Sequence, residues 1–142
     1  MILDGFTVLI EKGRWVDEEK LHDPVHWESI IDKLTHLIQN PDYPAYLQRH
    51  ELKRIRRIRL NDLRIYARLL PAAKICLVLA VVGRGEVKRD ETGGALDFGF
   101  LTYLQTHHDQ FLPDRFIPLE KRLPKVEQQE TETAPVFWGS TF

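Results

Sequence analysis

The fold is decided by residues 49–68, RHELKRIRRIRLNDLRIYAR, which predict a β-hairpin. Side chains alternate between the two faces of a strand, so strands at residues 57–60 and 63–68 separate two kinds of side chain. One face is apolar and carries Ile58, Leu60, Leu63, Ile65 and Ala67. The other carries four cations and one aromatic ring: Arg57, Arg59, Arg64, Tyr66 and Arg68. Asn61-Asp62 suits a tight turn, because both residue types tolerate positive φ.

Positive charge is concentrated in this same stretch. Eight of the twenty Lys and Arg residues lie within residues 49–68, against two acidic residues, although the formal charge of the 142-residue chain is −1. The net charge of the chain says little about its partners, but a local cluster of cations does. The predicted exposed arginine face indicates a polyanionic partner. A plainer interpretation is also open, since cationic side chains on a sheet discourage pairing with other strands.

The flanking sequence predicts the remaining elements of an α+β fold. Residues 6–10 form a first strand, and residues 15–22 a short helix. Asp23-Pro24 begins a longer helix that ends before Asn40-Pro41, with an apolar stripe at helical spacing. Residues 71–73 form a turn, and residues 74–82 a strand that is apolar without alternation and therefore central in its sheet. A last helix of about ten residues contains Phe98, Phe100, Leu101, Leu104 and Phe111.

We therefore expect a small antiparallel sheet, made of the N-terminal strand and a three-strand meander, packed against two N-terminal helices. Residues 1–112 form the predicted domain, and residues 113–142, with four prolines and the acidic QQETET segment, form a C-terminal extension that is disordered or binds a partner. No segment approaches the about 20 apolar residues of a membrane span, so we expect a soluble cytoplasmic protein. The single cysteine, Cys76, is predicted to be a buried apolar residue.

Other candidate site residues carry weaker signals. His22 and His26 stand four apart, but Pro24 interrupts them and no cysteine cluster completes a site, so we expect no metal and no cofactor. The adjacent residues His107, His108 and Asp109 cannot all point into one site from a helix, and we expect them at the surface.

Residues 50–87, HELKRIRRIRLNDLRIYARLLPAAKICLVLAVVGRGEV, resemble the RelE/ParE superfamily of type II toxin–antitoxin toxins. The likeness lies in a basic strand, a short turn, an arginine at the second position of the next strand (Leu63-Arg64-Ile65-Tyr66), and an apolar strand ending in Val82-Gly83-Arg84. It extends over roughly residues 5–110.

The resemblance implies a metal-independent endoribonuclease that cleaves ribosome-bound messenger RNA by attack of the 2′-OH on the adjacent phosphate. Arg64 and Arg84 match the family's basic residues and would contact that phosphate, and Glu86 is the candidate base. Arg57, Arg59 and Arg68 would bind the RNA backbone, and Tyr66 would stack a base.

Two alternatives stay open. One is a ParE-like toxin that inhibits DNA gyrase without nuclease activity, and the other is a nucleic-acid or protein binding module without toxicity. The segment GEVKRDET, residues 85–92, favours these because it lacks the Tyr or His that some family nucleases use for proton transfer. Both toxin interpretations imply a cognate antitoxin, whose acidic segment would cover the basic face in a toxin–antitoxin hetero-oligomer.

Overall fold

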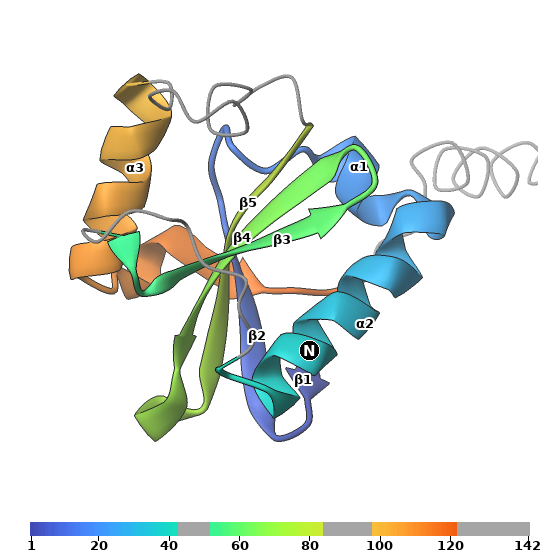
Figure 1. The fold of residues 1–142 in the computed structure, drawn as a ribbon, viewed down its shortest axis with the longest axis horizontal. Coiled ribbons are helices and arrows are strands. Elements are labelled where there is room, and N and C mark those ends of the chain that lie inside the picture. Colours follow the sequence, from blue (N-terminus) through green and yellow to red (C-terminus); the bar gives the residue numbers. More distant parts are fainter. Residues whose placement is uncertain (43–51, 84–97, 122–142) are drawn as a thin grey trace, which may run out of the picture.

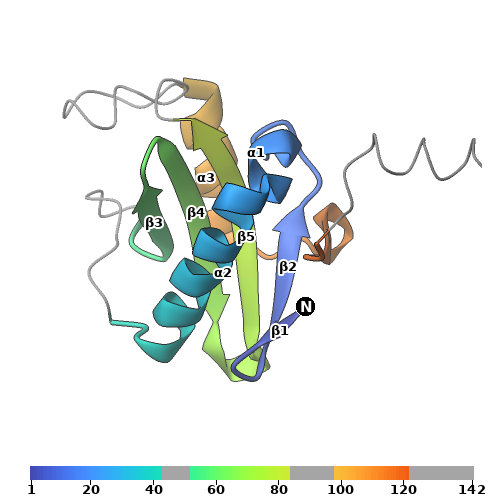
Figure 2. The same ribbon diagram turned by 90° about the vertical axis from the view of Figure 1, so that its right-hand side faces the viewer.

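A six-stranded sheet runs through the molecule, with α1 and α2 on one face and α3 on the other (Figures 1 and 2). The computed structural model describes residues 1–42, 52–83 and 98–121. Its strands are β1 (Ile2–Leu3), β2 (Phe6–Glu11), β3 (Ile55–Leu60), β4 (Leu63–Leu70), β5 (Ile75–Gly83) and β6 (Phe116–Pro118). Its helices are α1 (Glu18–His22), α2 (Pro24–Gln39), α3 (Phe98–Asp109) and the 3₁₀ turns η2 (Pro71–Ala73) and η4 (Pro113–Arg115).

The strand order is β1-β2-β5-β4-β3, with β6 also paired to β2. The predicted α+β fold, with a three-strand meander and two N-terminal helices, is confirmed. The meander β3-β4-β5 is antiparallel, whereas the N-terminal strand β2 joins β5 in parallel, so the sheet is mixed. β5 lies between β2 and β4 and is buried from Cys76 onward, which confirms its predicted central position.

The hairpin forms where the sequence predicts it, and both strands extend two residues further at the end away from the turn. Asn61 adopts a φ of 53°, a left-handed conformation that a tight turn needs and that Asn tolerates. Six residue pairs connect β3 to β4, from Ile55 opposite Arg68 to Leu60 opposite Leu63. The turn therefore fixes the register of the whole hairpin.

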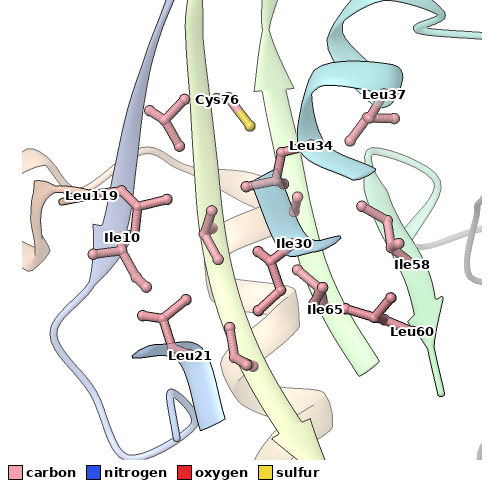
Figure 3. Close-up of a cluster of buried hydrophobic side chains, with 14 of the residues drawn as sticks. Ile10, Leu21, Ile30, Leu34, Leu37, Ile58, Leu60, Ile65, Cys76 and Leu119 are labelled. Atoms are coloured by element: carbon pink, nitrogen blue, oxygen red, sulfur yellow. The ribbon is translucent and has the colours of Figure 1, made fainter. Parts of the chain in front are cut away.

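α2 covers the apolar face of the hairpin. Its first turn is capped by Asp23, whose side chain accepts a hydrogen bond of 2.8 Å from the Val25 amide, and Pro24 occupies the first helical position. The buried stripe of α2 consists of Trp27, Ile30, Leu34, Leu37 and Ile38. Figure 3 shows part of this stripe against Ile58, Leu60 and Ile65, so the first core lies between α2 and the sheet.

α3 covers the opposite face and forms a second core. Phe100 and Leu104 of α3 are fully buried against Tyr66, Leu77 and Leu79 of the sheet. Trp15, predicted to lie in a helix, precedes α1 and packs on Phe100 with ring centroids 4.7 Å apart. Both faces of β4 and β5 are therefore buried over most of their length.

The C-terminal segment described by the structure adds to the sheet edge. β6 pairs antiparallel with β2, placing Phe116 opposite Glu11 and Ile117 opposite Ile10. Leu119 enters the first core, on the α2 side of the sheet. Residues 113–121, the first nine of the predicted extension, thus pack on the folded domain, with residues 116–118 as a strand of its sheet, and residues 122–142 lie outside the described residues.

Candidate nucleic-acid interface

The hairpin register aligns the predicted site residues on one face of the sheet. Arg57 lies opposite Tyr66, Arg59 lies opposite Arg64, and Arg64 in turn lies opposite Val82 of β5. Arg68 lies opposite Ile55 on the same face. Directly opposite residues point to the same side of a sheet, so the predicted sharing of one face is confirmed.

The predicted exposure of that face is wrong for three of its five residues. Tyr66 is 0% exposed, Arg64 5% and Arg68 8%, whereas Arg57 is half-buried and Arg59 is exposed. For Tyr66 and Arg68 the reason is α3, which lies across this face, places Phe100 edge-on against Tyr66 at a centroid distance of 5.0 Å and accepts a hydrogen bond from Arg68. Tyr66 therefore has no exposed ring surface on which a base could stack.

Arg64 fastens the hairpin turn. Its Nη1 donates to the backbone oxygens of Asn61 at 2.9 Å and Leu63 at 2.8 Å. A buried guanidinium needs such acceptors, because an unsatisfied buried cation is costly. Replacing Arg64 would therefore disturb the turn as well as remove charge.

Arg68 fastens α3 to the sheet. Its Nη1 donates to the backbone oxygen of His107 at 2.6 Å and lies 3.4 Å from that of Gln110. These carbonyls belong to the C-terminal end of the helix, where the helix dipole favours a cation. Burial, followed by the nearby Arg54, lowers the pKa of Arg68, while Asp109 opposes the shift. Even so, a guanidinium stays charged in the physiological range.

The accessible cations of this hairpin lie along β3, the last strand in the order of the sheet, and in the turn just before it. We define the basic edge as Lys53, Arg54, Arg57 and Arg59; of these, only Arg57 is half-buried, and the others are exposed. Arg56, between them, is directed to the exit of α2, where its Nη2 donates to the Pro41 oxygen at 2.9 Å. An edge strand with this charge resists pairing with a second copy of itself and attracts an anion.

Two predicted catalytic residues, Arg84 and Glu86, lie outside the described residues. They follow Gly83, which ends β5 opposite Leu63. The structure therefore brings together Arg57, Arg59 and Arg64 and does not test the other two.

A buried ionic cluster that the sequence did not predict lies on the same face of the sheet, beneath α3 and at the end of β2. His107 is 2% exposed, which corrects its predicted surface position; its Nε2 lies 2.9 Å from Oε2 of Glu11. The Nη2 of Arg115 donates to Oε1 of Glu11 at 3.0 Å. Glu11 ends a strand, His107 lies in the last turn of α3 and Arg115 lies 104 residues from Glu11, so no local spacing indicated this meeting.

Tyr103 borders this ionic cluster and keeps its proton. Its hydroxyl donates to the Leu79 oxygen, and its ring meets the ring of His107 at 4.6 Å. Burial, and secondarily Glu11, raise the pKa of Tyr103 far above its ordinary value. Burial also lowers the pKa of His107, with Arg115 and Arg68 acting in the same direction and Glu11 against it.

Neither group of charged residues has the form of a metal centre. Residues 1–42, 52–83 and 98–121 contain no cluster of three or more His, Cys, Asp or Glu side chains that could hold a metal ion. Within the same ranges, no helix has the length and apolar character needed to span a membrane.

Comparisons with known proteins returned no similarity: no family model, curated protein or solved structure matches the chain.

Proposed function

We propose that this chain is a cytoplasmic toxin of the RelE/ParE type that binds RNA along its basic edge and cleaves ribosome-bound messenger RNA. The observation that carries the proposal is the pair of neighbouring cations Arg57 and Arg59 on one face of β3, the last strand in the order of the sheet, with Arg64 on β4 opposite Arg59. Phosphates along a single strand of RNA are bound by such a row of cations through electrostatic attraction and charge-assisted hydrogen bonds.

In the proposed reaction the RNA 2′-OH attacks the adjacent phosphate, and cations stabilise the negative charge that develops there. Arg59 is exposed and is the first candidate to contact the phosphate, with Arg57 beside it. Arg64 supports them from the facing strand by holding the turn. We propose Arg84 as a further phosphate contact and Glu86 as the group that accepts the 2′-OH proton.

The burial of Tyr66 favours a second candidate, a ParE-like toxin that inhibits DNA gyrase or a related binding module. Without an accessible Tyr66, the described part of the basic face offers cations that bind phosphate but no group that exchanges a proton near neutral pH. Such a face suits binding better than cleavage. Both toxin candidates require a cognate antitoxin. We propose that the antitoxin forms a hetero-oligomer with the toxin and covers the basic edge with an acidic segment.

The binding part of the proposal is tested with a charge-matched pair of variants. Arg57→Gln/Arg59→Gln removes two charges from the basic edge, and Lys12→Gln/Lys33→Gln removes two exposed charges elsewhere. Each lost phosphate contact lowers the slope of log affinity against log salt by about 0.7 for a single strand. We expect the slope for single-stranded RNA to fall by about 1.4 in the first variant and to be unchanged in the second. Equal slopes in the two variants would refute binding along β3.

The catalytic part is tested in cells. The chain is induced, and RNA 5′ ends are mapped alongside DNA supercoiling. Codon-phased cleavage that is lost in Arg57→Gln/Arg59→Gln and kept in Lys12→Gln/Lys33→Gln supports the nuclease. Growth arrest with intact RNA and altered supercoiling supports the gyrase inhibitor instead. Arg64→Ala is a poorer probe, because it also removes the hydrogen bonds that hold the turn.

A further inference from the structure

The buried cluster of Glu11, His107 and Arg115 joins three segments that are distant in sequence. Glu11 ends β2, His107 lies in the last turn of α3, and Arg115 ends η4, next to β6. The side chain of Glu11 is 0% exposed and that of His107 is 3% exposed. The backbone reinforces the junction, since the Lys12 amide donates to the Arg115 oxygen at 2.9 Å. These contacts hold α3 and the segment that follows it against the end of β2.

Space for the Glu11 carboxylate depends on Gly13. A Cβ atom added at Gly13 would lie 2.9 Å from Oε1 of Glu11, the oxygen that accepts from Arg115. Real Cβ atoms essentially never approach another atom so closely. Gly13, which has no side chain, therefore leaves the space that the Glu11 carboxylate occupies.

The groups around the His107 ring indicate which of its two nitrogens carries the proton. The negative Oε2 of Glu11 lies 2.9 Å from Nε2 of His107, and a carboxylate attracts an N–H rather than a ring lone pair, so the proton of the neutral ring belongs on Nε2. In the neutral ring Nδ1 is then bare. Nδ1 is buried, and the described residues provide it with no hydrogen-bond partner. A second proton at Nδ1 would thus be buried without an acceptor.

We propose that α3 and residues 113–118 form a clasp on the sheet that opens when His107 is protonated at Nδ1. Among the described residues, the charged and titratable groups that face His107 come from four elements: Glu11 of β2, Arg68 of β4, Tyr103 of α3 and Arg115 of η4. Glu11 is already paired with Arg115, and Tyr103 is a neutral donor to Leu79. An imidazolium would therefore add positive charge beside Arg115 and Arg68 with no unpaired anion among these groups to balance it.

The sign of the pH dependence follows from linkage. Burial lowers the pKa of His107 in the closed state, whereas in the open state the ring regains an ordinary value of about 6.5. The open state then binds more protons, so the closed state loses stability as the pH falls below about 6.5. Between pH 7.5 and 5.5 the equilibrium constant for opening rises by up to about tenfold. Asp109 does not interfere, because its hydrogen bond with His108 lowers the pKa of this carboxyl further below that range.

Opening would uncover Tyr66 and Arg68, which α3 covers on the same face as Arg57. This consequence for ligand binding rests on the proposed RNA-binding function. The opening itself does not, and it is measured without RNA.

Hydrogen–deuterium exchange of the full chain at pH 7.5 and 5.5 tests the clasp, with protection factors corrected for the intrinsic pH dependence of amide exchange. We expect protection in residues 98–118 to fall by up to about tenfold at pH 5.5, while protection in residues 55–83 stays constant. Unchanged protection in residues 98–118, or an equal loss in both ranges, would overturn the proposal. The comparison within the wild-type chain does not depend on any variant folding.

Two histidine variants assign the effect. His107→Gln keeps a donor where Nε2 lies and cannot titrate, so the pH dependence in residues 98–118 should disappear. His108→Gln removes the neighbouring histidine, whose partner is Asp109, and should retain the wild-type pH dependence. A pH response that persists in His107→Gln, or is lost in His108→Gln, would contradict the assignment to His107.

Discussion

Phe100→Ala should strongly destabilise the protein, because this side chain holds α3 on the arginine face. Phe100 is fully buried, and its ring lies 4.7 Å from Trp15, 5.0 Å from Tyr66 and 6.2 Å from Tyr103, measured between centroids. Truncating a buried Phe to Ala costs about 3–5 kcal/mol. That range already includes lost ring contacts, and three aromatic pairs, each worth about 0.5–1.5 kcal/mol beyond burial, place Phe100 at its upper end. We therefore expect a loss of about 4–5 kcal/mol in the free energy of unfolding.

The matched control is Phe98→Ala, two residues earlier in the same helix. Phe98 is 81% exposed, so its truncation should change the free energy of unfolding by less than about 0.5 kcal/mol. Urea denaturation followed by fluorescence measures both variants, with the slope m checked for constancy. Should Phe100→Ala fail to fold, Phe100→Leu retains most of the apolar volume and should cost about 1–2 kcal/mol.

A cost below about 1 kcal/mol for Phe100→Ala would refute the second core. So would an equal cost for Phe98→Ala and Phe100→Ala. Either result would mean that α3 does not cover the face that carries Tyr66 and Arg68. The arginine face would then be exposed, as the sequence predicts.

Three further predictions test other parts of the fold. Asp23→Ala removes the cap on the Val25 amide and should cost about 1 kcal/mol of stability, against less than about 0.5 kcal/mol for exposed Asp32→Ala, by urea denaturation; equal costs would contradict the cap. Cys76 is fully buried, and burial raises the pKa of its thiol to about 12, so a thiol reagent at pH 8 should label it only as fast as the chain unfolds; rapid labelling of the folded protein would contradict its position. Gly13→Ala crowds the Glu11 carboxylate and should lower stability by about 1–3 kcal/mol, whereas an unchanged melting temperature would argue against a tightly packed ionic cluster.

The elements that were predicted correctly depend on contacts between residues close in sequence. The start of α2 follows from Asp23-Pro24, and the buried face of α2 follows from its helical spacing. The hairpin register follows from the alternation of side chains and from a turn at Asn61, which indeed adopts positive φ. The unbroken apolar run around Cys76 predicted a strand buried on both faces, and β5 is that strand.

The candidate site was harder to predict because burial depends on distant segments. Arg68 and an exposed arginine look alike in sequence, yet Arg68 is buried because two carbonyls at the end of α3 accept its hydrogen bonds. The same holds for His107, whose neighbours His108 and Asp109 indicated a polar surface. Its partner Glu11 lies at the other end of the described chain, so no short motif connects them.

The sequence by itself determined the local order of this protein: an amphipathic hairpin, a capped helix, a central apolar strand and a concentration of positive charge on one strand face. These follow from side-chain periodicity and turn chemistry, which act over a few residues. Only the tertiary structure decided which of those charges meet solvent. α3 crosses the arginine face, buries Tyr66 and Arg68, and leaves Arg57 and Arg59 on the basic edge, since access to water is a property of how distant segments pack.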